Sequence, residues 1–348
     1  MKVCIFGAGA IGGYIAAELA HAGDAEVTCI ARGPHLAAMK ENGLKLVYKD
    51  GTERNVRVNA TDDPAEAGPQ DFVFVTLKAH SSAAVADKMA PLFGPETALV
   101  TGQNGVPWWY FYKLEGKYEG TQVQSVDPGH RQWDLIGPER AIGCVVYPAA
   151  EIAEPGVIHH AYGNRFSIGE PSGEKTDRVQ ALSKLMGDAG LRAPVRPRIR
   201  DDMWVKIWGN VSLNPISALT GGTLAEMIDD SEVCGVIRAS MIEAQQSVKP
   251  SASSSLSMSK SALLGPVKWG TTRHPCCMIW NLGARWRSMR LWRPCKSWVA
   301  LLAWRRRQSI SCSASSNSAH GWQVATTAKF WIDALPPQKR VVRPVQRK

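Results

Sequence analysis

A glycine-rich turn near the start of the chain has the spacing that binds the diphosphate of a dinucleotide. Its residues are Gly7, Ala8, Gly9, Ala10, Ile11 and Gly12. The first glycine permits a tight bend, the second lets the backbone approach a pyrophosphate, and the third lets a helix pack closely on a strand. Unpaired N–H groups of the helix N-terminus then face the phosphates. A turn with a purely structural role is the alternative interpretation.

The elements on either side of this turn predict a parallel α/β sheet. A strand rich in β formers, residues 2–6, precedes the turn, and an Ala-rich helix, residues 11–22, follows it. Further strands are predicted at residues 26–31, 72–77 and 98–101. Because strands that alternate with helices form doubly wound parallel sheets, we expect an N-terminal α/β Rossmann domain.

Polar residues follow three of these strands, at the sheet edge where ligands bind. Arg32 follows the second strand, where an acid would hold the ribose 2′-hydroxyl of NADH. A guanidinium suits the 2′-phosphate of NADPH instead, so we expect NADPH as the cofactor. Lys78 and Asn104 follow the next two strands and are placed to reach the nicotinamide. A solvated arginine, a surface lysine and a turn asparagine are the structural alternatives.

A helix is predicted after a Pro-rich linker, residues 193–198. Asp201 or Asp202 is expected to cap this helix, which runs through residues 203–214. One helix face carries an amine and two amides at four-residue spacing, which are Lys206, Asn210 and Asn214. Taken alone, a lysine in the middle of a helix is usually a solvated charge.

Five motifs occur in an order and at separations that point to one family. They are GAGAIGG, VTLKAH, QNGVPWW, VVYPAAE and DDMWVKIWGNVSLNPISALT. Together they resemble the 2-dehydropantoate 2-reductase (ketopantoate reductase) family over about residues 1–246. The resemblance implies reduction of 2-dehydropantoate to pantoate, a step of pantothenate biosynthesis, with hydride from NADPH. It also implies a cleft between a Rossmann domain and an all-helical C-terminal domain.

The same resemblance implies roles for single residues. Lys206 matches the catalytic lysine of the family, and an ammonium there stabilises the charge that forms on the ketone oxygen and supplies a proton. Asn210 and Asn214 would bind substrate, Asn104 would lie between cofactor and substrate, and Ala149 would touch the cofactor. The family includes paralogues that reduce other 2-oxo acids. A homodimer is one possible assembly.

Two further alternatives concern substrate and reaction type. Pro107, Trp108 and Trp109 follow the Asn104 turn, where they either form an aromatic rim that selects a different substrate or pack in the core. Another two-domain dehydrogenase, of the 6-phosphogluconate dehydrogenase type, is the second enzyme hypothesis. We expect neither a metal site nor a disulfide framework, since the eight cysteines form no CxxC pair.

Charge divides the chain at about Gln246. Residues 1–246 hold 23 Lys and Arg against 30 Asp and Glu, whereas residues 247–348 hold 18 against one, Asp333. A basic tail with eight tryptophans suits a non-catalytic protein that binds NADPH or nucleic acid, or one that binds an anionic membrane surface. Because no run of 18 apolar residues exists, we expect a soluble cytoplasmic protein without a membrane partner.

A frameshift explains this basic segment better than a nucleic-acid-binding tail. If each codon starts at the third base of the preceding one, Trp280-Asn281 must encode glutamate and Met278-Ile279 must encode aspartate. These acids fall where the family pattern has them. We therefore expect a Rossmann domain at 1–196, the start of a helical domain at 197–246, and a frameshifted, disordered segment at 247–348. The helical domain would then be truncated, and this chain impaired.

Overall fold

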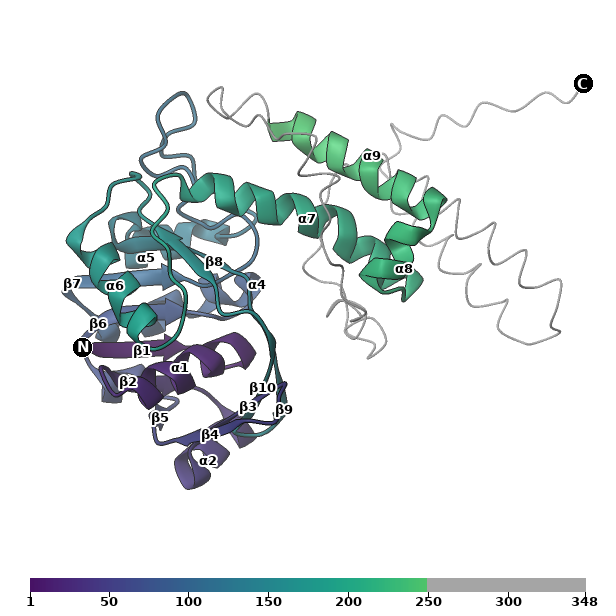
Figure 1. Ribbon diagram of the computed structural model, residues 1–348. Coiled ribbons are helices and arrows are strands. Elements are labelled where there is room, and N and C mark those ends of the chain that lie inside the picture. Colours follow the sequence, from purple (N-terminus) through teal and green to yellow (C-terminus); the bar gives the residue numbers. More distant parts are fainter. Residues whose placement is uncertain (249–348) are drawn as a thin grey trace, which may run out of the picture. The chain divides into compact units, whose positions relative to one another are not determined.

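Seven strands form the main sheet in the part of the chain that the structure describes, residues 1–248 of a computed structural model (Figure 1). In spatial order they are β11 (Phe166–Gly169), β8 (Ala141–Val146), β7 (Phe93–Thr101), β6 (Gln70–Val75), β1 (Lys2–Phe6), β2 (Glu26–Ile30) and β5 (Asn59–Thr61). All neighbours are parallel except β11, which is antiparallel to β8. Strands that follow β1 in the sequence lie on both sides of it in the sheet, so the predicted doubly wound sheet is confirmed.

A second, four-stranded sheet was not predicted from the sequence. Its strands, in spatial order, are β4 (Glu53–Val56), β3 (Leu44–Tyr48), β10 (Val157–Tyr162) and β9 (Ala149–Glu154). β3 pairs in parallel with β10, which lies more than a hundred residues further along the chain. Gly13, directly after the glycine-rich turn, meets this sheet, since a Cβ there would lie 2.8 Å from Ile158 Cγ1. The second sheet therefore packs directly behind the predicted dinucleotide turn.

Helices cover both faces of the main sheet, and three more form the described part of the C-terminal region. The α-helices are α1 (Ala10–Ala22), α2 (Gly33–Asn42), α3 (Pro64–Ala67), α4 (Ala79–Ser82), α5 (Arg131–Ile136), α6 (Asp177–Asp188), α7 (Ile199–Thr220), α8 (Leu224–Asp229) and α9 (Ser231–Val248). Short 3₁₀ helices are η1 (Ala83–Leu92), η2 (Pro128–His130) and η3 (Pro138–Arg140). None of the helices in residues 1–248 has the length and apolar content of a membrane span.

Strand β1 shows how the core is divided between the two faces of the sheet. Val3 and Ile5 pack in a cluster that includes α1 and α6, whereas Cys4 and Phe6 pack in a second cluster with η1 and α7. Successive side chains of a strand point to opposite faces, and all four are buried. Such burial on both faces is typical of parallel sheets that helices cover on each side.

The start of α7 differs from the prediction that Asp201 or Asp202 caps the helix. The helix begins at Ile199, and its N-cap residue, Arg198, makes no side-chain cap. The two carboxylates lie in the first turn, where arginines bind them: Arg198 Nη2 lies 2.7 Å from Asp201, and Arg196 Nε lies 3.0 Å from Asp202. Because Ile199 is buried in the core, the helix starts before these acids.

The Pro-rich stretch at residues 193–198 is bound to the sheet for part of its length. Ile168 of β11 donates its N–H to Pro194 O, and Arg196 donates its N–H to Ile168 O. The segment thus adds backbone bonds to the edge of β11 before α7 begins. The predicted segment 247–348 lies outside the described residues except for the last two residues of α9.

Candidate active site

The glycine-rich turn between β1 and α1 has no room for larger side chains at two of its glycines. Gly7 has a φ of +100°, and a Cβ there would lie 2.6 Å from Leu77 Cδ2. A Cβ on Gly12 would lie 2.5 Å from both Gly7 O and Thr76 Oγ1. Gly7 therefore needs the backbone freedom of glycine, and Gly12 permits the close approach of α1 to β1.

Backbone hydrogen bonds hold this turn against β2. The N–H groups of Gly7 and Ala8 both donate to Ile30 O, at 3.1 and 3.2 Å. Gly9 N–H donates to Gly7 O at 2.7 Å, and Gly13 N–H donates to Gly9 O, which starts the helix. The first N–H groups of a helix have no partners within it, so those of α1 are free to bind an anion.

Lys78 and Asn104 follow β6 and β7, which are parallel neighbours in the sheet. Gln103 links the loops that carry them, because its Nε2 donates to Leu77 O at 2.8 Å. Both side chains are exposed, Lys78 as the N-cap residue of α4 and Asn104 in the loop after β7. The structure therefore brings the two residues to the same edge of the sheet as the glycine-rich turn.

Arg32 lies directly beyond β2, two residues after the carbonyl that holds the glycine-rich turn. It is the N-cap residue of α2, and its side chain is exposed. Within residues 1–248 no carboxylate forms an ion pair with its guanidinium. The guanidinium is therefore available to an anionic group of a ligand that lies along the turn.

Lys206 lies near the other end of this edge, over the loop that follows β8. Its Nζ is 5.5 Å from the centre of the Tyr147 ring, a distance at which an ammonium is attracted by an aromatic face. Burial lowers the pKa of this amine to about 8, and the neighbouring Cys144 thiol has a smaller effect that raises the pKa. No carboxylate among the described residues pairs with it.

The first turn of α7 positions this lysine against the main sheet. Arg200 donates to three backbone carbonyls, those of Tyr110 (2.8 Å), Pro171 (2.6 Å) and Tyr112 (2.6 Å). Met203 packs so closely on β8 that a Cβ on Gly143 would lie 2.9 Å from Met203 Cε. Lys206 is less than one turn further along, so these contacts determine where its amine lies.

Comparisons with known proteins match both parts of this arrangement. The family model described as ketopantoate reductase PanE/ApbA matches residues 3–173, and the model for its C-terminal part matches residues 198–262. The 2-dehydropantoate 2-reductase of Mesorhizobium japonicum is 54% identical over 245 residues, which are 70% of this chain and 75% of that protein. The chain belongs to the ketopantoate reductase family.

Solved structures agree with the family assignment. A Ralstonia solanacearum protein assigned to the ketopantoate reductases has a TM-score of 0.67 and 42% identity, over 70% of this chain and 75% of that one. A dimeric ketopantoate reductase from Staphylococcus aureus shares the fold, with a TM-score of 0.60 and 16% identity over 88% of this chain and 99% of that one. The C-terminal family match extends sixteen residues past Gln246, where we expected the resemblance to end.

The remaining residues implied by the family resemblance lie on two elements. Asn210 and Asn214 follow Lys206 along α7 at successive helical turns and are half-buried, and their side chains form no hydrogen bond within residues 1–248. Ala149 is the first residue of β9, two residues after Tyr147, and is also half-buried. Ala149 is therefore two residues along the chain from the tyrosine whose ring lies under the Lys206 amine.

Of the two interpretations of the aromatic residues after Asn104, the rim that selects a substrate is wrong. Trp108 and Trp109 are 1% and 0% exposed, and both pack in the core cluster beneath η1 and α7. Trp109 Nε1 donates to Thr101 Oγ1 at 3.1 Å, which satisfies its only polar atom. The alternative, a packing role, is therefore confirmed for these two tryptophans.

Several residues at this site were missed from the sequence. Tyr147 lies within the VVYPAAE motif but was given no role, because β8 was not predicted. Arg200 carried no signal, since its partners are backbone carbonyls 29 to 90 residues away. Thr76 lies within the VTLKAH motif, and His35 lies three residues after Arg32, but neither had a spacing that indicated its contacts.

Proposed function

We propose that this chain is an NADPH-dependent reductase that converts ketopantoate, or a closely related 2-oxo acid, to the 2-hydroxy acid. One observation carries the proposal. The glycine-rich turn and the buried amine of Lys206 belong to the same edge of one parallel sheet, where cofactor and substrate bind in such folds. The comparisons favour this function over a non-catalytic or nucleic-acid-binding protein.

The described residues fit a dinucleotide. Gly7 and Gly12 allow the turn and α1 to pack more closely than a Cβ would permit, and the N–H groups that open α1 are free for the diphosphate. Arg32 would bind the 2′-phosphate of NADPH, while Lys78, Asn104 and Ala149 would contact the nicotinamide half. Arg32 is exposed and makes no ion pair within residues 1–248, which supports a role in binding a phosphate.

Lys206 would be the proton donor of the reaction. Bound NADPH supplies the hydride, which adds to the carbonyl carbon of the 2-oxo acid. As the C=O π bond breaks, its electron pair moves to the oxygen, and Lys206 Nζ transfers a proton to that oxygen. A pKa of about 8 leaves the amine protonated at neutral pH and makes it a stronger acid than a solvated lysine. Asn210 and Asn214 would orient the substrate from the same helix.

We also propose the domain limits and the frameshift. Residues 1–196 form the dinucleotide domain, residues 197–246 begin the substrate domain, and residues after 246 are read in a shifted frame. The acidic residues that the shifted reading restores, and the loss of Glu from the last 102 residues, support this proposal. The 348-residue chain would then bind NADPH but reduce ketopantoate slowly, in the cytoplasm, as a monomer or homodimer.

Two proteins test the proposed function: the 348-residue chain and a chain whose frame is restored by one inserted base after codon 246. We expect the frame-restored chain to oxidise NADPH when ketopantoate is added, with pantoate formed in equal amount. The 348-residue chain should do so at least about 100-fold more slowly, since part of its substrate domain is replaced. A frame-restored chain that oxidises no NADPH with ketopantoate or a related 2-oxo acid would contradict the proposal.

A further inference from the structure

Two carbonyl groups of the glycine-rich turn accept hydrogen bonds from side chains that lie outside the turn. Thr76, in the loop after β6, donates its hydroxyl to Gly7 O at 2.7 Å. His35, in the first turn of α2, contacts Ala8 O through Nε2 at 2.8 Å. These two bonds come from a loop and from a helix, and they hold consecutive carbonyls of the turn.

The hydrogen bonds of His35 determine which of its nitrogens carries the proton. Gly156, at the turn between β9 and β10, donates its N–H to His35 Nδ1 at 2.9 Å. Nδ1 is therefore an acceptor, so the proton is on Nε2, which donates to Ala8 O. The ring thus links the second sheet to the glycine-rich turn through one accepted and one donated hydrogen bond.

We infer that Thr76 and His35 form a carbonyl clamp, which keeps the oxygens of Gly7 and Ala8 turned away from the diphosphate of the cofactor. A carbonyl oxygen carries partial negative charge and would repel a phosphate that binds the N–H groups of α1. Peptide groups next to a glycine rotate readily between orientations, and Gly7 has a φ of +100°. The clamp removes that freedom at the point where it would weaken anion binding.

The clamp rests on the proposed function, because it acts on the affinity for NADPH. Thr76 and His35 are positioning residues: each bonds a carbonyl of the turn, and neither is assigned a contact with the cofactor. A hydrogen bond of ordinary strength corresponds to about a 3- to 10-fold change in an equilibrium constant. We therefore expect an effect of that size on NADPH binding from the loss of either bond.

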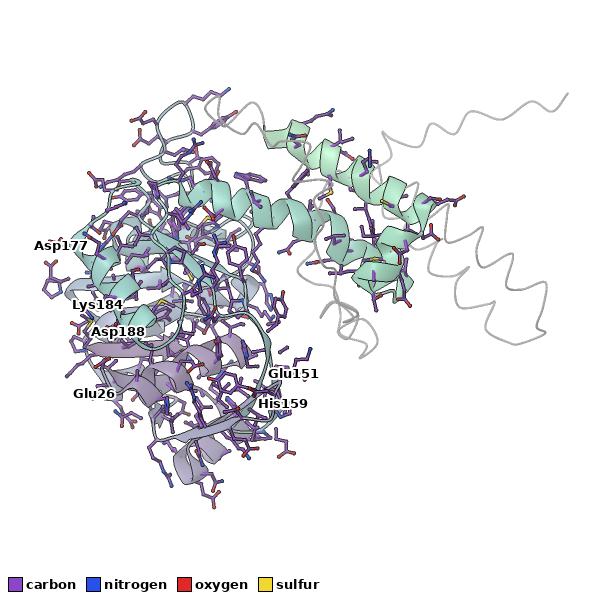
Figure 2. The ribbon with its side chains drawn as sticks, in the orientation of Figure 1. Glu26, Glu151, His159, Asp177, Lys184 and Asp188 are labelled. Atoms are coloured by element: carbon purple, nitrogen blue, oxygen red, sulfur yellow. The ribbon has the colours of Figure 1, made fainter. Side chains whose placement is uncertain are left out.

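Matched pairs of substitutions in the 348-residue chain test the clamp. Thr76→Ser keeps the hydroxyl, whereas Thr76→Val replaces it with a methyl group of similar volume. His35→Gln places its amide N–H near the position of Nε2, whereas His35→Asn keeps an acceptor for Gly156 N–H but does not reach Ala8 O. His159→Leu is the control, because that histidine is exposed on β10 (Figure 2).

The dissociation constant of NADPH is measured from the fluorescence of the reduced nicotinamide. The dissociation constant of adenosine 2′-monophosphate, which lacks the diphosphate, is measured for comparison. We expect Thr76→Val and His35→Asn to weaken NADPH binding about 3- to 10-fold and to leave adenosine 2′-monophosphate binding unchanged. Thr76→Ser, His35→Gln and His159→Leu should bind both ligands as the parent chain does. Thermal unfolding without ligand identifies any variant that fails to fold. Thr76→Ala or His35→Leu then takes the place of that variant in the test.

Three results would overturn the clamp. NADPH affinity that is unchanged in Thr76→Val and His35→Asn excludes it while the proposed function stands. Equal weakening of both ligands, or Ser and Gln variants as weak as Val and Asn, shows a general structural role instead. A parent chain that binds adenosine 2′-monophosphate but no NADPH overturns the proposed function and the clamp together.

Discussion

The glycine-rich turn and the middle of α7 carry the two halves of the proposed chemistry, and they are built in different ways. The turn presents backbone N–H groups from consecutive residues, and Gly7 and Gly12 make it possible through their lack of a side chain. Lys206 is a single side chain, placed by contacts that Arg200 and Met203 make with distant parts of the chain. The N–H groups proposed to bind phosphate therefore belong to one short motif, whereas the position of the proposed proton donor depends on tertiary packing.

The largest effect that separates these two sites should come from Lys206→Met. Methionine keeps most of the length and apolar volume of lysine but has no proton to give. In the frame-restored chain we expect the kcat for ketopantoate reduction to fall about 10²- to 10⁴-fold, because general acid and electrostatic assistance are both lost. The dissociation constant of NADPH, from fluorescence titration, should stay the same. A variant that loses NADPH affinity as well would show that the two sites are not separate.

The pH dependence of the same reaction gives the next largest effect. Burial lowers the pKa of Lys206 to about 8, and the proposed role of proton donor needs the protonated amine. The rate should be constant below that pH and should fall about tenfold per pH unit above it, as the amine loses its proton. Lys206→Met should show no such break. A break near 10.5, the ordinary value for a solvated lysine, would contradict the burial of this amine.

A smaller effect should come from the contact that positions α7. Arg200→Met removes three hydrogen bonds to carbonyls, and we expect the free energy of unfolding in urea to fall by about 3 kcal/mol. The control is Lys184→Met, which removes an exposed ion pair with Asp188 on α6 (Figure 2). That change should leave stability as it is, because exposed pairs contribute little. Equal free energies of unfolding for the two variants would show that the hydrogen bonds of Arg200 do not hold α7 in place.

The same contrast explains which parts of the molecule could be predicted from the sequence. β1 was predicted at its observed bounds, and the turn after it was identified, because strand, glycines and helix follow one another directly. The four-stranded sheet was missed, since β3 finds its partner β10 only through pairing between distant segments. Pairing between two strands that are distant in the sequence leaves no periodic pattern of residues in either strand.

The start of the C-terminal helix shows where local patterns mislead. Asp201 and Asp202 have the residue type of an N-cap, yet arginines bind both of them inside the first turn. Trp108 and Trp109 follow a candidate site residue, yet they are core residues. In each case burial decided the role, that of Ile199 for the start of the helix and that of the two tryptophans for their packing, and a local pattern does not show burial. Lys206 itself was found by its resemblance to the family, whereas its burial was visible only in the fold.

Titration of the 348-residue chain with NADPH and with NADH measures the proposed cofactor binding on its own, because it needs no substrate domain. We expect saturable binding of NADPH that is tighter than that of NADH. We also expect that Arg32→Asp weakens NADPH binding about 10- to 100-fold while NADH binding changes little, since only the 2′-phosphate would meet Arg32. A chain that shows no saturable signal with either cofactor, or an Arg32→Asp variant that loses both equally, would contradict the proposed cofactor binding.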